Sequence, residues 1–245
     1  MTMTLEERET YVAARRLDAH ERLINAQAFI ASATVLAGEL REAGRAEEAL
    51  ALAEESLTMC RRRFARRRRY WDMLPRCLEV VAEHRRAQGQ RSAALQATQE
   101  AAAIRRKRGF SGRHRDQAFA VGSCLWDLTD DLRAVGRADD AVAAAREAIP
   151  AWACGAVELP NMRGAVGVSY DKLSRALGDA GQWPEALVAS REAVAILSEE
   201  PPTADLADSL TQLATVLATL GQDDEARRAR EQASAISQDE HSPSP

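Results

Sequence analysis

The stretch LSRALGDAGQWPEALVASREAVAI, residues 173–196, decides the fold of this chain of 245 residues. Leu173 and Leu177 stand at a helical spacing that ends at Gly181, the residue type that most readily closes a helix in the left-handed conformation. Pro184 follows three residues later, in the first turn of a second helix, where its missing N–H has no intrahelical partner to lose. The stretch therefore predicts two antiparallel helices joined by a short turn, an αα-hairpin.

The same pattern occurs five times along the chain. Its glycine recurs with separations of 45, 47, 45 and 40 residues, at Gly44, Gly89, Gly136, Gly181 and Gly221. A branched apolar residue stands eight positions before each glycine, at Leu36, Val81, Leu128, Leu173 and Leu213. An alanine stands five positions after it, at Ala49, Ala94, Ala141, Ala186 and Ala226. This period indicates stacked hairpins, because one hairpin buries only one side of itself and needs neighbours.

On these residues the copies resemble tetratricopeptide repeats, in the bacterial variety of ~40 residues that also occurs in kinesin-light-chain-like arrays. The resemblance covers roughly residues 22–237 and implies an all-α, right-handed α-solenoid of about five antiparallel helix hairpins. We expect a capping helix in residues 1–20, a repeat domain over 21–237 and a disordered tail at 238–245. The repeats would span about 21–60, 70–108, 114–151, 160–199 and 203–237. Arg85 departs from the pattern, because the other four repeats have leucine at that position.

Composition excludes several classes of protein. No stretch has the eighteen or more apolar residues of a membrane span, and the N-terminus is too charged for a secretory signal, so we expect a cytoplasmic protein. The four cysteines, Cys60, Cys77, Cys124 and Cys154, form no CxxC pair and have no histidine at ligand spacing. We therefore expect no metal site and no disulfide framework, and interpret these cysteines as thiols in helix packing.

The motifs of catalysis are missing from the sequence. A phosphate-binding Walker loop needs a Gly-Lys pair, which the chain lacks, and the four histidines have no neighbouring nucleophile pattern. Carboxylates are frequent, but in helices with 29% charged residues most of them belong to solvated faces. We expect a protein that is not an enzyme and uses no cofactor.

The resemblance also implies where a partner would bind. In the tetratricopeptide family, the residues thirteen, ten, six and three positions before each glycine line a concave groove. These offsets predict a partner-binding groove of Arg76, Glu79, Glu83, Arg86, Ser123, Trp126, Asp130, Arg133, Asp171 and Arg175. Two simpler interpretations stay open. Glu79 and Glu83 could pair with the arginines of their own helix, and Trp126 could be a core residue instead of a binding anchor.

Two junctions between repeats are strongly basic. Residues 57–116 contain 17 Lys and Arg against 5 Asp and Glu, a net charge of +12 in a chain whose total is −4. The predicted basic edge consists of Arg61, Arg62, Arg63, Arg66, Arg67, Arg68, Arg69, Arg105, Arg106, Lys107, Arg108, Arg113 and Arg115. It is a set of solvated loops, a docking site for an acidic protein surface, or a nucleic-acid site with stacking aromatics such as Phe64 and Phe110.

Two further expectations concern loops and the C-terminal end. Residues 153–167 would form an irregular junction, since they contain three glycines and a proline. No further helix is predicted after the fifth repeat, so an open apolar face of Ala226, Ala229, Ala233 and Ile236 would allow self-association through the C-terminal repeat.

Together these features predict a non-enzymatic adaptor or regulatory scaffold that binds another protein by a peptide or helix. A receptor for a signalling peptide would be compatible with the same fold. The alternative is a nucleic-acid-associated protein that uses the arginine-rich segments 61–69 and 105–115.

Overall fold

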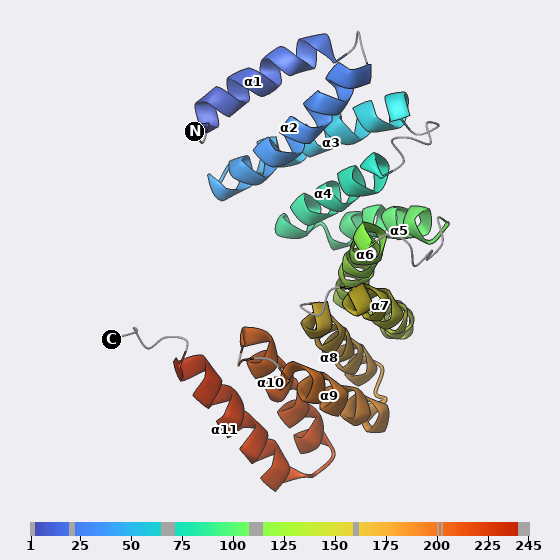
Figure 1. Cartoon of the computed structure of the whole chain (residues 1–245), viewed down its shortest axis with the longest axis vertical. Coiled ribbons are helices and arrows are strands. Elements are labelled where there is room, and N and C mark those ends of the chain that lie inside the picture. Colours follow the sequence, from blue (N-terminus) through green and yellow to red (C-terminus); the bar gives the residue numbers. More distant parts are fainter. Residues whose placement is uncertain are drawn as a thin grey trace. The chain divides into compact units, whose positions relative to one another are not determined.

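The computed structural model describes residues 3–19, 23–64, 72–107, 115–158, 162–199, 201 and 203–239. These residues form helices and no strand, as the sequence predicts (Figure 1). Each of the five glycine patterns joins two helices into a hairpin, so the all-α architecture of stacked helical hairpins is confirmed.

The chain divides into two compact units, residues 1–108 and 109–245. The sequence analysis treated the repeats as one array and did not foresee this division, which falls inside the second basic junction. Unit 1 contains α1 (Leu5–Asp18), α2 (Leu23–Glu42), α3 (Ala46–Phe64), α4 (Met73–Ala87) and α5 (Arg91–Lys107). Unit 2 contains α6 (Arg115–Ala134), α7 (Ala138–Glu158), α8 (Arg163–Asp179), α9 (Trp183–Leu197), α10 (Ala204–Thr219) and α11 (Asp223–Asp239).

The five repeat glycines make the turns inside the hairpins. Each has a φ angle between 72° and 79°, a conformation that L side chains rarely adopt. At Gly181 the backbone N–H donates to the carbonyl of Gly178 at 2.9 Å, and the next N–H, of Gln182, donates to Leu177 at 2.8 Å. The last carbonyls of the first helix are thus satisfied while the chain reverses within three residues.

Small residues let the helices approach closely. The alanines five positions after each glycine are all completely buried, at Ala49, Ala94, Ala141, Ala186 and Ala226. Two other contacts depend on glycine itself: a Cβ at Gly122 would lie 2.5 Å from the Trp152 indole, and one at Gly167 would lie 2.7 Å from Leu197. Close packing of this kind is what an Ala-rich sequence with few aromatic residues can provide.

The N-terminal helix α1 begins with a capping box. The Thr4 hydroxyl accepts a hydrogen bond from the Glu7 N–H, and the Glu7 carboxylate accepts one from the Thr4 N–H. α1 packs on α2 through Val12, and the Arg8 guanidinium lies 2.7 Å from the Glu39 carboxylate of α2. Its exposed side carries charged residues such as Glu6, Glu7 and Arg16 together with Tyr11 and Leu17.

The expectation of an open apolar face at the C-terminal repeat is wrong. Ala226, Ala229 and Ala233 are buried in the hairpin that α11 forms with α10, and Ile236 packs against a core cluster that includes Leu210. The outward side of α11 carries Asp, Glu, Arg and Gln side chains instead. The last helix thus turns its apolar stripe inward, and the apolar surface proposed for self-association is not exposed.

Two helix boundaries also differ from expectation. α7 continues through Pro150 to Glu158 and α8 begins at Arg163, so most of the predicted irregular junction at 153–167 is helical. Pro150 is tolerated on the exposed side of its helix. α11 ends at Asp239, which makes the first two residues of the predicted tail helical, whereas 240–245 lie outside the described residues. Within the described chain, each helix is too short or too polar to serve as a membrane span.

A pair of glycine substitutions in unit 1 tests the role of the turns. A Cβ added at Gly44 would meet no other atom within 4 Å, but Gly44→Ala forces alanine into a φ of 79°. This backbone strain should lower the free energy of unfolding by about 1–2 kcal/mol. Gly38→Ala, inside α2 four residues before its end and also free of contacts, should raise it by about 0.5–1 kcal/mol. Urea unfolding followed by circular dichroism measures both, and equal effects for the two variants would contradict this assignment.

Candidate functional site

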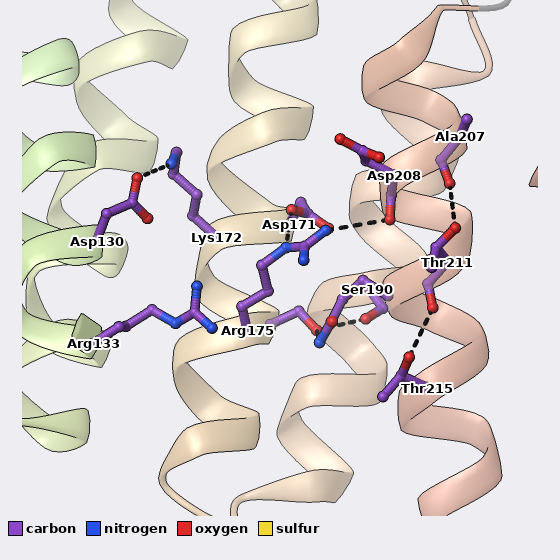
Figure 2. Close-up of polar contacts among 12 residues, drawn as sticks. Asp130, Arg133, Asp171, Lys172, Arg175, Ser190, Ala207, Asp208, Thr211 and Thr215 are labelled. Atoms are coloured by element: carbon purple, nitrogen blue, oxygen red, sulfur yellow. Dashed lines mark hydrogen bonds and ion pairs between the residues drawn. The ribbon is translucent and has the colours of Figure 1, made fainter. Parts of the chain in front are cut away.

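The first helices of the three hairpins in unit 2 enclose a groove. α8 contacts both α6 and α10, and a cavity of about 330 Å³ opens between them (Figure 2). We call it the unit 2 groove; its lining consists of Asp130, Val168, Asp171, Lys172, Arg175, Asp205, Asp208, Ser209 and Thr211. Three residues predicted from the glycine offsets, Asp130, Asp171 and Arg175, therefore lie together in one groove.

Both cations of the groove are engaged by neighbouring carboxylates. The Lys172 ammonium donates to Asp130 of α6 at 2.6 Å. The Arg175 guanidinium donates to Asp171 at 2.7 Å and reaches the backbone carbonyl of Asp208 on α10 at 3.3 Å (Figure 2). Asp171 is 8% exposed, whereas the Arg175 side chain is 32% exposed, so this pair is partly buried. The two contacts tie α8 to the first helices on either side of it and preform the groove.

The α10 side of the groove was missed by the sequence analysis. Asp208 and Thr211 stand thirteen and ten positions before Gly221, the same offsets that predicted the other residues, and would have been found had the fifth repeat been included. Asp205 and Ser209 lie at other offsets, one turn apart on the same helix. The offset rule therefore finds the groove but not all of its polar lining.

Trp126 is mainly a packing residue. Its indole stacks on Trp152 at 4.5 Å between ring centroids, and its N–H donates to the Ser169 hydroxyl of α8 at 2.8 Å. Trp126 is half-buried and is not among the residues that line the groove. These contacts favour the interpretation of Trp126 as part of the α6–α7–α8 core over that of a binding anchor.

Arg133, another predicted groove residue of α6, also joins neighbouring repeats. The Arg133 guanidinium donates to Asp179 of α8 at 2.6 Å. Ser123 is half-buried on the same helix and, like Arg133, does not line the groove. On the groove side of unit 2, ion pairs therefore join the first helices α6 and α8.

In unit 1, the predicted groove residues of α4 pair with other helices. Glu79 accepts two hydrogen bonds from Arg105 of α5, at 2.6 and 2.9 Å, and Glu83 lies 3.0 Å from Arg41 of α2. Both carboxylates therefore have arginine partners on helices other than α4. Arg76 is exposed and Arg86 is half-buried.

A second cavity, of about 350 Å³, lies in unit 1 between α1, α2 and α3. Its floor is apolar and includes Val12, Leu36 and Leu40. An ion pair between Arg16 of α1 and Glu55 of α3, at 2.7 Å, joins two residues that line it. This cavity was not predicted from the sequence, because the glycine offsets that locate the groove apply only to first helices.

The described part of the basic edge is only partly exposed. Arg62, Arg106 and Lys107 are exposed, Arg63 is half-buried, and Arg61 lies 2.5 Å from Glu100 in an exposed pair. Arg105 is the exception: it is 6% exposed and contacts Glu79 and Asp72, so it is not part of an exposed edge. Its position in the last turn of α5 faces α4 instead of solvent. The predicted residues Arg66, Arg67, Arg68, Arg69, Arg108 and Arg113, and the side chain of Arg115, lie outside the described residues.

Among the residues that the structure describes, His84 and the four cysteines do not line the unit 2 groove. Burial lowers the pKa of His84, whose ring is 2% exposed. A hydrogen bond with Cys77 lowers the pKa of the Cys60 thiol, and the same contact raises the pKa of Cys77. No cluster of His, Cys, Asp or Glu suited to a metal ion occurs in the part of the chain that the structure describes.

Comparison with known proteins identifies the type of repeat. Residues 29–66 and 166–199 match the family model described as tetratricopeptide repeat. The comparison with curated proteins gives no match. The chain is similar to the crystal structure of BtubC from P. vanneervenii, with a TM-score of 0.75 and 20% identity over 100% of this chain and 96% of that one.

Two other solved structures show the same fold. One is a putative kinesin light chain from Podosopora anserina with TPR-like repeats, with a TM-score of 0.68 and 22% identity over 87% of this chain and 97% of that one. The other is a Rap protein complexed with Competence and Sporulation Factor, with a TM-score of 0.59 and 15% identity over 88% and 56%. The repeats of this chain are therefore tetratricopeptide-like, and its fold is that of tetratricopeptide-repeat proteins.

A matched pair of arginine substitutions tests whether the buried Arg105 contributes more to stability than the exposed Arg61. Arg105→Met leaves the half-buried Glu79 carboxylate without its main partner and should lower the free energy of unfolding by about 1–3 kcal/mol. Arg61→Met removes only an exposed pair and should change it by less than about 1 kcal/mol. Urea unfolding of both variants is the measurement, and an Arg105→Met variant as stable as Arg61→Met would show that Arg105 is solvated.

Proposed function

We propose that this chain is a non-enzymatic protein–protein interaction adaptor that binds a peptide or helical segment of a partner in the unit 2 groove. The observation that carries the proposal is the convergence of groove-facing positions, six, ten and thirteen residues before the repeat glycines, from three successive first helices. Asp130, Asp171 and Asp208 come from α6, α8 and α10 and line one cavity. An extended segment lying across three repeats would meet each helix in turn.

The size of the groove supports a peptide as ligand. About 330 Å³ accommodates a few side chains and is at the small end of ligand-binding cavities. The ion pair of Lys172 with Asp130 joins α8 to α6, and the hydrogen bond from Arg175 to the backbone carbonyl of Asp208 joins α8 to α10, so the groove is formed before a ligand arrives. Preformed grooves bind peptides with a smaller loss of conformational entropy.

The chemistry of the groove supports binding over catalysis. None of the described residues that line it is a histidine or cysteine, and four of its six charged side chains form two ion pairs, Lys172 with Asp130 and Arg175 with Asp171. A nucleophilic mechanism needs a base within hydrogen-bond reach of the nucleophile. The tetratricopeptide fold generally mediates protein–protein interactions, and the similar Rap protein is complexed with Competence and Sporulation Factor.

The test is a pull-down with the tagged full-length chain from a nuclease-treated lysate of its own source, followed by mass spectrometry. Thr211→Arg places a long side chain in the groove and should reduce recovery of the partner at least about tenfold. Thr219→Arg adds the same residue to the same helix at an exposed position outside the groove, and it should leave recovery unchanged.

Two outcomes would contradict the proposal. Equal recovery of the partner by Thr211→Arg and Thr219→Arg would place binding elsewhere on the chain. Recovery of partners only from lysate without nuclease would favour the alternative function in nucleic-acid association, which should also weaken steeply with salt.

A further inference from the structure

We infer that the unit 2 groove takes a basic side chain, best an arginine, from a peptide segment of the partner protein. The inference rests on the proposed function and specifies its ligand. It starts from the charges that line the groove: four aspartates, Asp130, Asp171, Asp205 and Asp208, against the two cations Lys172 and Arg175. The groove therefore has an excess of two negative charges.

The excess charge is located on α10. Lys172 pairs with Asp130, and Arg175 pairs with Asp171. Among the described residues, no ion pair or hydrogen bond reaches the carboxylates of Asp205 and Asp208. Arg175 contacts only the backbone oxygen of Asp208, whose side chain extends from α10 towards α8 (Figure 2). Two uncompensated carboxylates thus stand on one face of one helix, three residues apart.

A buried hydroxyl lies beside these carboxylates. Ser209 lines the groove, is 1% exposed, and has no hydrogen-bond partner in the described part of the chain. The three threonine hydroxyls that follow on α10, those of Thr211, Thr215 and Thr219, each donate to the carbonyl four residues earlier, as Thr211 does to Ala207 at 2.9 Å (Figure 2). Buried hydroxyls are normally satisfied, so Ser209 has room for a bond from a ligand donor.

The favourable effect of a negative charge at the start of a helix explains the position of Asp205 but not those of Asp208 and Ser209. Asp205 lies in the first turn of α10, where a negative charge is favourable without any ligand. Asp208 and Ser209 lie beyond that turn, so this effect does not account for them. Their positions next to the cavity indicate a ligand that donates hydrogen bonds and carries positive charge.

An arginine side chain fits these requirements. Its planar guanidinium has five N–H donors, enough for two carboxylates and a hydroxyl, and it is weakly hydrated compared with an ammonium group. The carboxylates of the groove belong to no cluster suited to a metal ion among the described residues, which favours an organic cation. We therefore place the guanidinium of the partner between α8 and α10.

The experiment is a selection of a random 12-residue peptide display library on the immobilised full-length chain. Enriched peptides should share an arginine or lysine at a fixed position. The best of them, labelled with fluorescein, should bind the Asp205→Asn/Asp208→Asn variant at least about tenfold more weakly than the unmodified chain. Asp139→Asn/Asp223→Asn removes the same charge from the exposed first turns of α7 and α11, away from the groove, and should bind like the unmodified chain.

The remaining outcomes overturn the inference in distinguishable ways. Peptides that lack a fixed basic residue, or that bind Asp205→Asn/Asp208→Asn and Asp139→Asn/Asp223→Asn equally, would overturn the inferred ligand. If the binding of such peptides were lost in Thr211→Arg, the proposed groove function would survive. A selection that enriches no peptide would overturn both. Thermal unfolding of each variant separates loss of binding from loss of fold.

Discussion

The structure depends on one backbone conformation, the positive φ of the glycine that joins the two helices of each repeat. That conformation satisfies the last carbonyls of the first helix and reverses the chain within three residues, so the second helix returns along the first. Because the alanine five positions later is always buried, both helices approach closely and in the same register in every repeat. Counting backwards from the glycine therefore identifies equivalent faces of all first helices, and the unit 2 groove is made from one such face.

Ion pairs between first helices turn this shared face into a preformed site. Lys172 reaches back to Asp130 of α6, whereas Arg175 reaches forward to the backbone of Asp208 on α10. In unit 1 the Arg41–Glu83 pair joins α2 to α4 in the same manner. Exposed pairs of this kind contribute little to stability, so their main effect is to fix side chains in the groove and to decide which charges stay available to a ligand.

The sequence predicted the features that local chemistry controls. Gly181 and Pro184 marked the hairpin, and the repeated offsets located Asp130, Asp171 and Arg175 in one groove. The sequence did not predict which partner a charged side chain selects, because that depends on which helix packs beside it. Arg105 was assigned to an exposed edge, but it turns towards Glu79 of α4 and is buried. The inward orientation of the apolar stripe on α11 likewise depends on packing against α10.

The central claim is that the partner lies across the first helices of unit 2. Hydrogen–deuterium exchange of the full-length chain, measured by mass spectrometry with and without the captured partner, tests it directly. The account predicts slower exchange on binding in peptides from α6, α8 and α10, with little change in α7, α9 and α11. Slower exchange confined to those second helices, or to unit 1, would contradict it.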